Sequence, residues 1–337
     1  MKPRVLVDCR QYGREEDWER LAAHAELVEP QREDPYSEAE LIEALQGVQG
    51  VIRLGGRIPE LNRVVFSGAP DLQIAGVRGD RFGRDVDLGA AKEFGVRVID
   101  TDNIASAPPV AEWVLALVLV CLRNGGAVYR QMMAGIEQWA NAQNDDFVNG
   151  ELTEKRVGLI GCGHVGQRLI ELLEPFRVDL KVSDPYLEEE VVERLSIGRG
   201  SLEEVLEHAE ILVVQVPHTP KTEKMIGGRE LEILGKGSIL ISCCRGPVID
   251  QEALIDRLEA GELIAGLDVF DPEPLPGDSR LRELPNAFIS PHIAWYAPHV
   301  FHRYFSCMAL EFERFFTGQP LQSELTQRMV DIRNGRL

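Results

Sequence analysis

The chain reads Val157-Gly158-Leu159-Ile160-Gly161-Cys162-Gly163-His164-Val165-Gly166, a short apolar run followed directly by a G-x-G-x-x-G motif. In such a unit Gly161 permits a tight turn, Gly163 lets the backbone approach a pyrophosphate, and Gly166 lets a helix pack close to the strand. The N–H groups at the start of that helix are then left for the anion. The segment therefore predicts a strand, a phosphate-binding turn and a helix.

An acidic residue follows at the distance that a dinucleotide site requires. Asp184 lies 18 residues beyond Gly166, at the end of the apolar-rich segment 180–183, where a carboxylate can accept from a ribose 2′-hydroxyl. Pro185 and Tyr186 come next, so no adjacent Arg or Lys neutralises a 2′-phosphate, and the charge favours NAD over NADP. An ordinary glycine turn with a surface aspartate is the alternative interpretation.

Strand and helix patterns alternate on both sides of this unit. The first hundred residues contain strand patterns at 4–8, 50–52, 73–75 and 97–99 and helical patterns at 15–23, 37–45 and 88–94. A second series has strand patterns at 156–160, 180–183, 211–214, 238–241 and 264–268. Strands that alternate with helices are typical of βαβ units in parallel sheets. The chain is therefore predicted to be an α/β protein.

Particular residues set the expected helix ends. Ser37 and Ser201 each begin a capping box, Asp250 can cap a helix over 251–260, and Pro175 ends the helix that follows the glycine motif. Pro109 is expected at the start of a helix that runs to about residue 122.

The last helical stretch, 298–316, is rich in aromatic residues that need a surface to cover them. We expect this helix to return to the first domain.

Composition narrows the class of partner. The 337 residues include 36 Lys+Arg and 55 Asp+Glu, which gives a formal charge of −19, and 44% of the residues are apolar. A chain of this length is predicted to form two compact domains, each large enough to bury a core of its own. An acidic surface does not collect on phosphate backbones, so nucleic acid and anionic membranes are excluded as default partners. The longest apolar run, 113–122, is about half a membrane span and predicts a buried helix. A small ligand is expected instead.

The six cysteines show neither a disulfide framework nor paired metal-ligand spacing, so we predict no metal site and a reducing cytoplasm. No apolar signal core precedes the first strand pattern. Cys162, Cys243 and Cys244 allow a redox interpretation, but small buried residues behind a binding site are the favoured one.

Three later segments, together with the glycine motif, carry a resemblance to a known family. They are Ser242-Cys243-Cys244-Arg245-Gly246-Pro247-Val248-Ile249-Asp250, Gly266-Leu267-Asp268-Val269-Phe270-Asp271-Pro272-Glu273-Pro274 and Ser290-Pro291-His292-Ile293-Ala294-Trp295. The sequence resembles the NAD-dependent D-isomer-specific 2-hydroxyacid dehydrogenases, which include hydroxypyruvate/glyoxylate reductases and phosphoglycerate dehydrogenases. The resemblance covers nearly the whole chain, beginning with segments 76–79 and 87–92. It implies an enzyme that transfers a hydride between NAD(H) and a small 2-oxo or 2-hydroxy acid.

The resemblance implies an active site of Arg245, Glu273 and His292. A protonated imidazole beside a carbonyl supplies the proton that reduction requires, and this is the role expected of His292. Glu273 against the other ring nitrogen orients the imidazole and favours its charged form. Arg245 offers two parallel N–H donors to the substrate carboxylate and carbonyl.

The resemblance also implies which residues bind the cofactor and the substrate. Expected cofactor contacts are Gly161, Gly163, His164, Val165, Gly166, Asp184, Val216, Pro217, Thr222, Cys243, Cys244, Arg245, Asp268 and His292. Expected substrate contacts are Val77, Arg78, Gly79, Arg245, His292 and Trp295. In the family, the residue at Asp268 contacts the nicotinamide amide, and capping of the following turn is its alternative role.

The family's architecture implies two doubly wound parallel-sheet domains. A Rossmann dinucleotide-binding domain, 106–296, is expected to be inserted into a flavodoxin-like substrate domain made of 1–105 and 297–337, with the substrate in the cleft between them. The apolar helix 109–122 is a candidate for homodimer contacts.

Some alternatives stay open. The family's usual glycine-rich continuation is replaced here by residues 79–84, so the identity of the substrate is not fixed by the resemblance. Four arginines of the first domain either bind a second anionic group of the substrate or face solvent: Arg57, Arg78, Arg81 and Arg84. Trp295 either walls the substrate's variable group or packs between domains. The segment 292–296 also resembles the C-terminal-binding corepressors, NAD-regulated docking proteins, so a docking module is the rival function.

Overall fold

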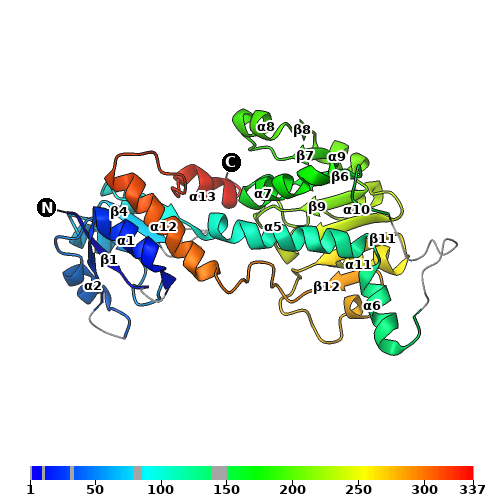
Figure 1. Cartoon of the computed structure of the whole chain (residues 1–337), viewed down its shortest axis with the longest axis horizontal. Helices are drawn as coiled ribbons and strands as arrows, with labels where there is room; N and C mark the ends of the chain where they lie inside the picture. Colours follow the sequence, from blue (N-terminus) through cyan, green and yellow to red (C-terminus); the bar gives the residue numbers. More distant parts are fainter. Residues whose placement is uncertain (1, 10–11, 31–33, 79–85, 138–149, 337) are drawn as a thin grey trace. The chain divides into compact units, whose positions relative to one another are not determined.

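A computed structural model describes residues 2–9, 12–30, 34–78, 86–137 and 150–336 (Figure 1). The chain forms two compact units. Unit 1 contains Met1–Ser106 and Ala297–Leu337, and unit 2 contains Ala107–Tyr296. Unit 2 is thus an insertion in the sequence of unit 1, and each unit has a parallel sheet of its own. The predicted fold class is confirmed.

Unit 1 is built on a five-stranded parallel sheet in the order β2-β1-β3-β4-β5, the flavodoxin-like order. Its strands are β1 Arg4–Val7, β2 Glu26–Val28, β3 Gly50–Ile52, β4 Ile74–Val77 and β5 Arg97–Asp100. The sequence patterns predicted four of them. They missed β2, since three residues with a leading glutamate carry too little periodicity to be recognised.

The helices of unit 1 cover both faces of this sheet. They are α1 Glu15–His24, α2 Glu38–Ala44, α3 Arg63–Gly68, α4 Leu88–Glu93, α12 Val300–Phe316 and α13 Gln327–Arg333. Figure 1 shows α12 beside α1, and the two helices are in contact. Phe305 of α12 packs against Trp18 of α1 with ring centres 4.2 Å apart. The aromatic C-terminal helix therefore returns to the first domain, as predicted.

Unit 2 is built on a seven-stranded parallel sheet in the order β12-β11-β10-β9-β6-β7-β8. Its strands are β6 Arg156–Ile160, β7 Asp179–Ser183, β8 Gly198–Arg199, β9 Ile211–Val214, β10 Ser238–Ser242, β11 Leu263–Leu267 and β12 Ala287–Ile289. Strand order reverses between β6 and β9. Doubly wound sheets bind ligands at such a reversal, outside the carboxyl ends of the strands.

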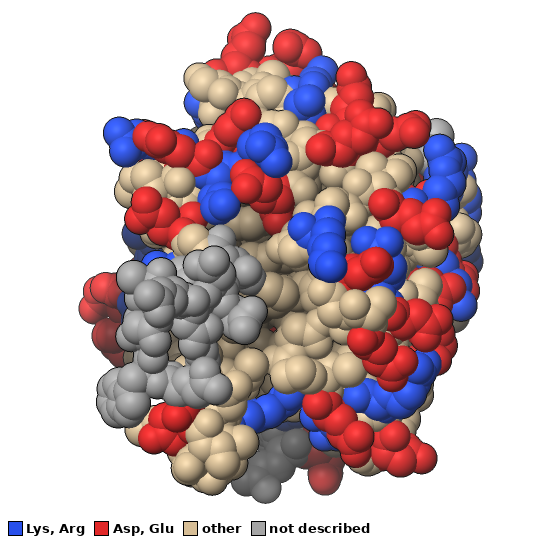
Figure 2. Space-filling model, turned by 90° about the vertical axis from the view of Figure 1, so that its right-hand side faces the viewer, with Lys and Arg blue, Asp and Glu red and all other residues tan. Residues whose placement is uncertain are grey.

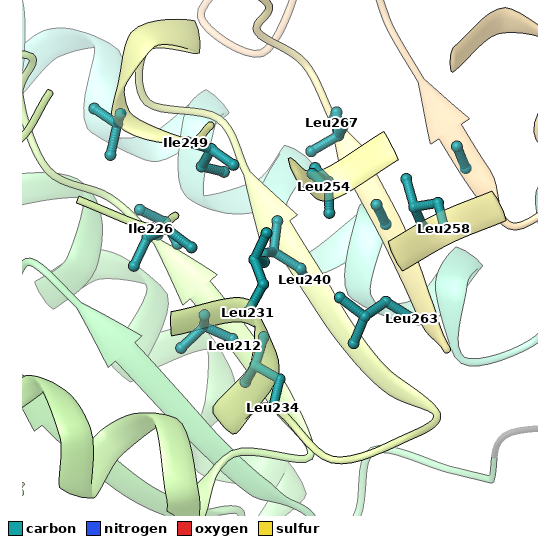
Figure 3. Packing of buried hydrophobic residues seen from close by; sticks show 14 of the residues in the cluster. Leu212, Ile226, Leu231, Leu234, Leu240, Ile249, Leu254, Leu258, Leu263 and Leu267 are labelled. Carbon is teal, nitrogen blue, oxygen red and sulfur yellow. The ribbon is translucent and has the colours of Figure 1, made fainter. Parts of the chain in front are cut away.

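Two apolar clusters lie on the two faces of the unit 2 sheet. Its helices are α5 Asp102–Cys121, which begins at the end of the first unit 1 segment, α6 Gly125–Ala134, α7 His164–Leu173, α8 Glu189–Leu195, α9 Leu202–His208, α10 Gly228–Ile233 and α11 Gln251–Glu259. Side chains of α9, α10 and α11 form one cluster with the strands (Figure 3), and side chains of α5 and α7 form the other. The sheet is therefore covered by helices on both sides.

The prediction that Pro109 begins a helix is wrong. Helix α5 starts at Asp102, and both Pro108 and Pro109 lie inside it. A proline has no N–H, so Pro109 leaves the carbonyl of Ala105 without its usual helical donor. Arg303 of α12 supplies a replacement, because its Nη1 donates to that carbonyl at 3.2 Å.

Helix α5 is also the one described helix that is long and apolar enough to cross a membrane. Its window Ile104–Cys121 has a mean hydropathy of 1.9, and 56% of the window is buried inside the structure. A core helix of a globular protein has the same length and composition.

Over the face shown in Figure 2, blue Lys and Arg side chains are interspersed with red Asp and Glu side chains rather than gathered in one basic patch.

The predicted caps are present. Ser37 and Ser201 each form a complete capping box, and Asp250 accepts the N–H of Ala253 at the start of α11. Pro175 lies in a 3₁₀ turn, Glu174–Phe176, directly after α7.

Candidate active site

The glycine motif forms a tight turn between β6 and α7. Gly161 has φ of +90°, and a Cβ there would lie 2.5 Å from the carbonyl oxygen of Gln215. A Cβ on Gly166 would lie 2.6 Å from the carbonyl oxygen of Gly161, so this glycine permits the close packing of helix on strand. A Cβ on Gly163 would meet nothing within 4 Å. The open side of the turn at Gly163 leaves room for a phosphate to approach the first turn of α7, where His164 and Val165 lie.

Asp184 follows β7 and is tied to the same turn. Its Oδ2 accepts the N–H of Cys162 at 2.8 Å, and its Oδ1 accepts the N–H of Tyr186 at 2.9 Å. Each carboxylate oxygen has a second lone pair, so the half-buried Asp184 can accept a further hydrogen bond. This geometry fits an adenosine ribose held beside the glycine turn.

The loop after β9 lies across the strand reversal from the glycine turn. Thr222 fixes this loop, because its hydroxyl donates to the carbonyl of Pro217 at 2.6 Å and accepts the N–H of Thr219 at 2.8 Å. Val216 packs against a core cluster. The buried Nε2 of Gln215 has no hydrogen-bond partner among the described residues. A buried amide without a partner fits a loop that a ligand completes.

The three cysteines near the motif are packing residues. Cys243 and Cys244 follow β10 and belong to the clusters on opposite faces of the sheet. Burial raises the pKa of the Cys162 and Cys244 thiols to about 11, and it raises the pKa of Cys243 well above its usual value. Thiols of this kind carry little thiolate near neutral pH, which disfavours the redox interpretation.

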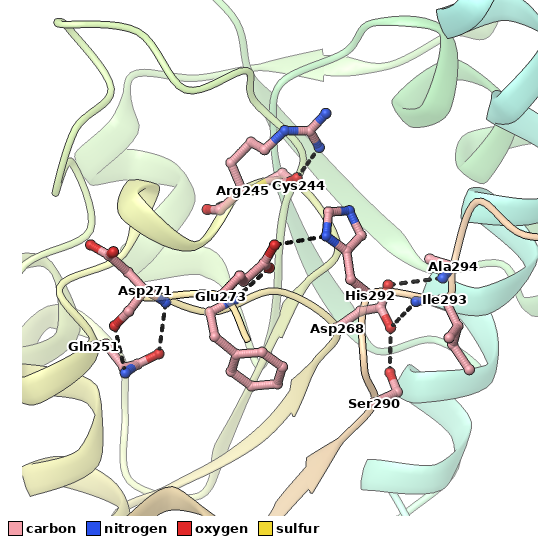
Figure 4. Close-up of polar contacts among 11 residues, drawn as sticks. Cys244, Arg245, Gln251, Asp268, Asp271, Glu273, Ser290, His292, Ile293 and Ala294 are labelled. Carbon is pink, nitrogen blue, oxygen red and sulfur yellow. Dashed lines mark hydrogen bonds and ion pairs between the residues drawn. The ribbon is translucent and has the colours of Figure 1, made fainter. Parts of the chain in front are cut away.

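The side chains of Glu273 and His292 meet in the loops that follow β11 and β12. Nδ1 of His292 lies 2.9 Å from Oε2 of Glu273, while Oε1 of Glu273 accepts the N–H of Phe270 at 2.9 Å. The side chains are 36% and 35% exposed. Within the described ranges Nε2 of His292 has no partner, so the ring has one nitrogen fixed by a carboxylate and one free for a substrate (Figure 4).

Arg245 lies at the carboxyl end of the neighbouring strand β10. Its Nη1 donates to the carbonyl of Cys244, and no carboxylate in the described part of the chain pairs with its guanidinium. In Figure 4 the Arg245 side chain extends above the imidazole of His292, and the Glu273 carboxylate faces the ring. The structure thus brings the three predicted catalytic side chains to one edge of the sheet.

A cavity of about 570 Å³ borders Glu273 and His292. It is lined by Phe270, Glu273, Pro274, Leu275, Arg282, Ile289, Ser290, Pro291 and His292. Its volume is in the range of small-molecule sites, and its walls are mostly apolar.

Asp268 is buried directly after β11. Its carboxylate accepts from Ser290 and from the backbone on the far side of His292. Trp113 of α5 donates from Nε1 to the Ser290 hydroxyl at 3.1 Å. Sequence reasoning gave no role to Ser290 or Trp113, although both stand in segments that it singled out. Trp295 packs half-buried against the cluster of α5 and α7.

The predicted substrate segment of unit 1 is described in part. Val77 is buried at the end of β4, and the guanidinium of Arg78 lies 4.6 Å from the ring centre of Tyr304 and 5.2 Å from that of Phe301. Arg78 therefore stacks on aromatic rings of α12. Arg57 donates to the carbonyl of Asp8. Gly79, Arg81 and Arg84 lie outside the described residues.

Comparison with known proteins places this site in a family. The D-isomer specific 2-hydroxyacid dehydrogenase NAD-binding domain matches residues 115–294, more than half of the chain. The chain belongs to the D-isomer specific 2-hydroxyacid dehydrogenase family. Unit 2 is accordingly the NAD-binding domain of a family enzyme, an oxidoreductase.

Relatives of this dehydrogenase family support the assignment. The chain is 32% identical over 262 residues to glyoxylate/hydroxypyruvate reductase B of Yersinia enterocolitica, with 76% of this chain and 77% of that protein covered. A phosphoglycerate oxidoreductase from Rhizobium etli has the same fold, with a TM-score of 0.82 and 21% identity over 97% of this chain and 99% of that one.

The NAD complex of a D-isomer specific 2-hydroxyacid dehydrogenase from Lactobacillus delbrueckii ssp. bulgaricus also shares the fold. Its TM-score is 0.73 at 21% identity, and 96% of this chain and 100% of that chain are covered.

Proposed function

We propose that this chain reduces a small 2-oxo acid to the D-2-hydroxy acid with NADH, and that His292 is the acid that protonates the substrate carbonyl oxygen. The observation that carries the proposal is the 2.9 Å contact between Glu273 and Nδ1 of His292, which leaves Nε2 free. When bound, NADH supplies the hydride. In the reverse direction His292 accepts the hydroxyl proton.

Glu273 acts through His292. Its negative charge stabilises the imidazolium, and its second bond, to the N–H of Phe270, fixes the carboxylate in place. Arg245 supplies the positive charge and the fork of N–H donors that a 2-oxo acid requires for its carboxylate and carbonyl oxygens. The absence of a carboxylate partner among the described residues supports this role, because the guanidinium is not already neutralised.

The proposal includes the choice of cofactor. The residues around Gly163 and Asp184 fit a dinucleotide, with the pyrophosphate at the start of α7 and the adenosine ribose at Asp184. A carboxylate at that point repels the 2′-phosphate of NADPH, so NADH is the expected cofactor.

Substrate, assembly and location complete the proposal. The reductase from Yersinia enterocolitica is named for glyoxylate and hydroxypyruvate, and we propose 2-oxo acids of that size for this chain. We also propose a homodimer and a cytoplasmic location; the six free cysteines support a reducing compartment.

The test is the initial rate with NADH across glyoxylate, hydroxypyruvate, phosphohydroxypyruvate, pyruvate and branched 2-oxo acids, for wild type and for His292→Ala. We expect turnover with at least one small 2-oxo acid and a loss of about 10²- to 10⁴-fold in the variant, with NADH binding retained. NADH binding without turnover on any of these acids would support the docking-module alternative. Near-normal turnover by His292→Ala would refute the assignment of the acid.

A further inference from the structure

Asp268 holds the loop that carries His292 from both sides. Its side chain is fully buried directly after β11. Oδ1 accepts the hydroxyl of Ser290 at 2.5 Å and the N–H of Ile293 at 3.0 Å, and Oδ2 accepts the N–H of Ala294 at 2.8 Å. Figure 4 shows these contacts below the imidazole. One carboxylate therefore binds the residue two places before His292 and the two residues after it.

The loop needs such support because of its backbone conformation. His292 has φ of +54°, in the left-handed region that residues other than glycine rarely adopt. Such a conformation costs free energy and persists only where the surroundings overdetermine it. The N–H of His292 donates to the carbonyl of Ser290 at 3.0 Å, which closes the turn. The hydrogen bonds to Asp268 fix the chain on either side of that turn.

The same network is anchored in the core of unit 2. Nε1 of Trp113 donates to the Ser290 hydroxyl at 3.1 Å, and Trp113 packs against the cluster of α5 and α7. The N–H of Asp268 donates to the carbonyl of Ser242 at the end of β10 at 3.0 Å. The backbone of Asp268 is thus bound to strand β10, and the Ser290 hydroxyl is bound to helix α5.

We propose that Asp268 is a positioning residue for His292, and that Ser290 and Trp113 assist it. Three of about four lone-pair sites on the Asp268 carboxylate are taken by the loop. Its role toward His292 is then to present the imidazole to Glu273 and to the substrate. This inference rests on the proposed function, because it assigns a purpose to the position of His292.

The variant Asp268→Asn tests the role with little change in shape. An amide replaces one acceptor oxygen by an NH₂ group, which faces a backbone N–H donor instead of accepting from it. The buried N–H loses its partner, and the left-handed turn loses part of its support. A displacement of about 1 Å at a reacting group costs about 100-fold in rate. We expect kcat to fall about 10- to 100-fold, with the substrate KM and the NADH dissociation constant changed less than about twofold.

Two neutral variants accompany it. Ser290→Ala and Trp113→Phe both keep the Asp268 charge. Trp113→Phe removes the hydrogen bond to Ser290, and Ser290→Ala removes that bond together with the one to Asp268, so kcat should fall in both, by less than in Asp268→Asn. If Asp268→Asn does not fold, Ser290→Ala and Trp113→Phe test the proposal in its place. An unchanged kcat in both variants would then overturn it.

A control carboxylate lies in the same sheet, at the amino ends of the strands and so on the side away from His292. Glu210, which directly precedes β9, accepts the N–H of Arg156 at 3.2 Å and the Nζ of Lys155 at 3.0 Å. Glu210→Gln should lower the melting temperature without lowering kcat.

The decisive comparison adds Asp268→Asn to His292→Ala. If Asp268 acts through the imidazole, its loss should cause no further fall in the residual rate of the His292→Ala enzyme. An equal fall in both backgrounds would overturn the proposal, and so would a normal kcat with weakened NADH binding, which would indicate a cofactor contact. All of these measurements require an active wild-type enzyme. A wild type without turnover would contradict the proposed function itself. An active wild type with either of the two results above would contradict only the role of Asp268.

Discussion

Oε2 of Glu273 lies 2.9 Å from Nδ1 of His292, and the other oxygen of the same carboxylate accepts the N–H of Phe270. The carboxylate is therefore fixed before it meets the imidazole, so its charge acts on a ring of defined orientation. This arrangement has consequences for the rate of reduction that can be measured directly.

Glu273→Gln should lower kcat for 2-oxo acid reduction. Reduction requires a proton on the carbonyl oxygen, which the imidazolium of His292 donates. The glutamine can still hydrogen-bond to His292 but supplies no negative charge to stabilise the charged ring. Initial rates of wild type and variant at saturating NADH measure it. A kcat equal to that of wild type would refute the pairing.

Replacing Asp184 should change cofactor preference. Asp184→Ala combined with Tyr186→Arg removes the negative charge beside the ribose and places a positive one nearby. Charge-assisted hydrogen bonds contribute about 1.5–3 kcal/mol, so the ratio of kcat/KM for NADPH to that for NADH should rise roughly 10- to 100-fold. Steady-state kinetics with both cofactors checks this. Equal efficiencies of NADH and NADPH in the wild type would contradict the premise.

Trp295→Ala separates two roles for a half-buried aromatic side chain. If Trp295 walls the substrate's variable group, the order of kcat/KM among 2-oxo acids should change, and larger side chains should gain relative to glyoxylate. If it only packs against the cluster of α5 and α7, the order stays the same while the melting temperature falls. Rates with a panel of acids, together with a thermal melt, distinguish the two.

The cysteines should resist alkylation in the folded protein. Burial raises the pKa of Cys162, Cys244 and Cys307 to about 11, so only about one thiol in a thousand is a thiolate at pH 8. Treatment with iodoacetamide at pH 8 should leave activity intact, and mass spectrometry should find all six sites modified only after unfolding in urea. Rapid modification of Cys162 in the native state would be evidence for a redox role.

The sequence predicted the features that depend on neighbours along the chain. The turn at the glycine motif and the capping boxes at Ser37 and Ser201 follow from local rules. The three catalytic positions came from a resemblance of flanking segments, and the structure brings Glu273 and His292 into contact.

Features that depend on distant residues escaped prediction. Pro109 lies inside α5, and Arg303, far along the chain, donates to the carbonyl that the proline leaves without a helical donor. The hydrogen bond from Trp113 to Ser290 joins residues 177 positions apart, so no local pattern indicates it.

The insertion of unit 2 into unit 1 sets an order of events during synthesis. Phe305 and Phe312 of α12 are wholly buried among the strands of unit 1, yet they are made after all of Ala107–Tyr296. At about 5–20 residues per second, the N-terminal strands wait roughly 10 to 40 s for the helix that covers them. Throughout that interval the ribosome holds a nascent chain with an exposed apolar sheet face.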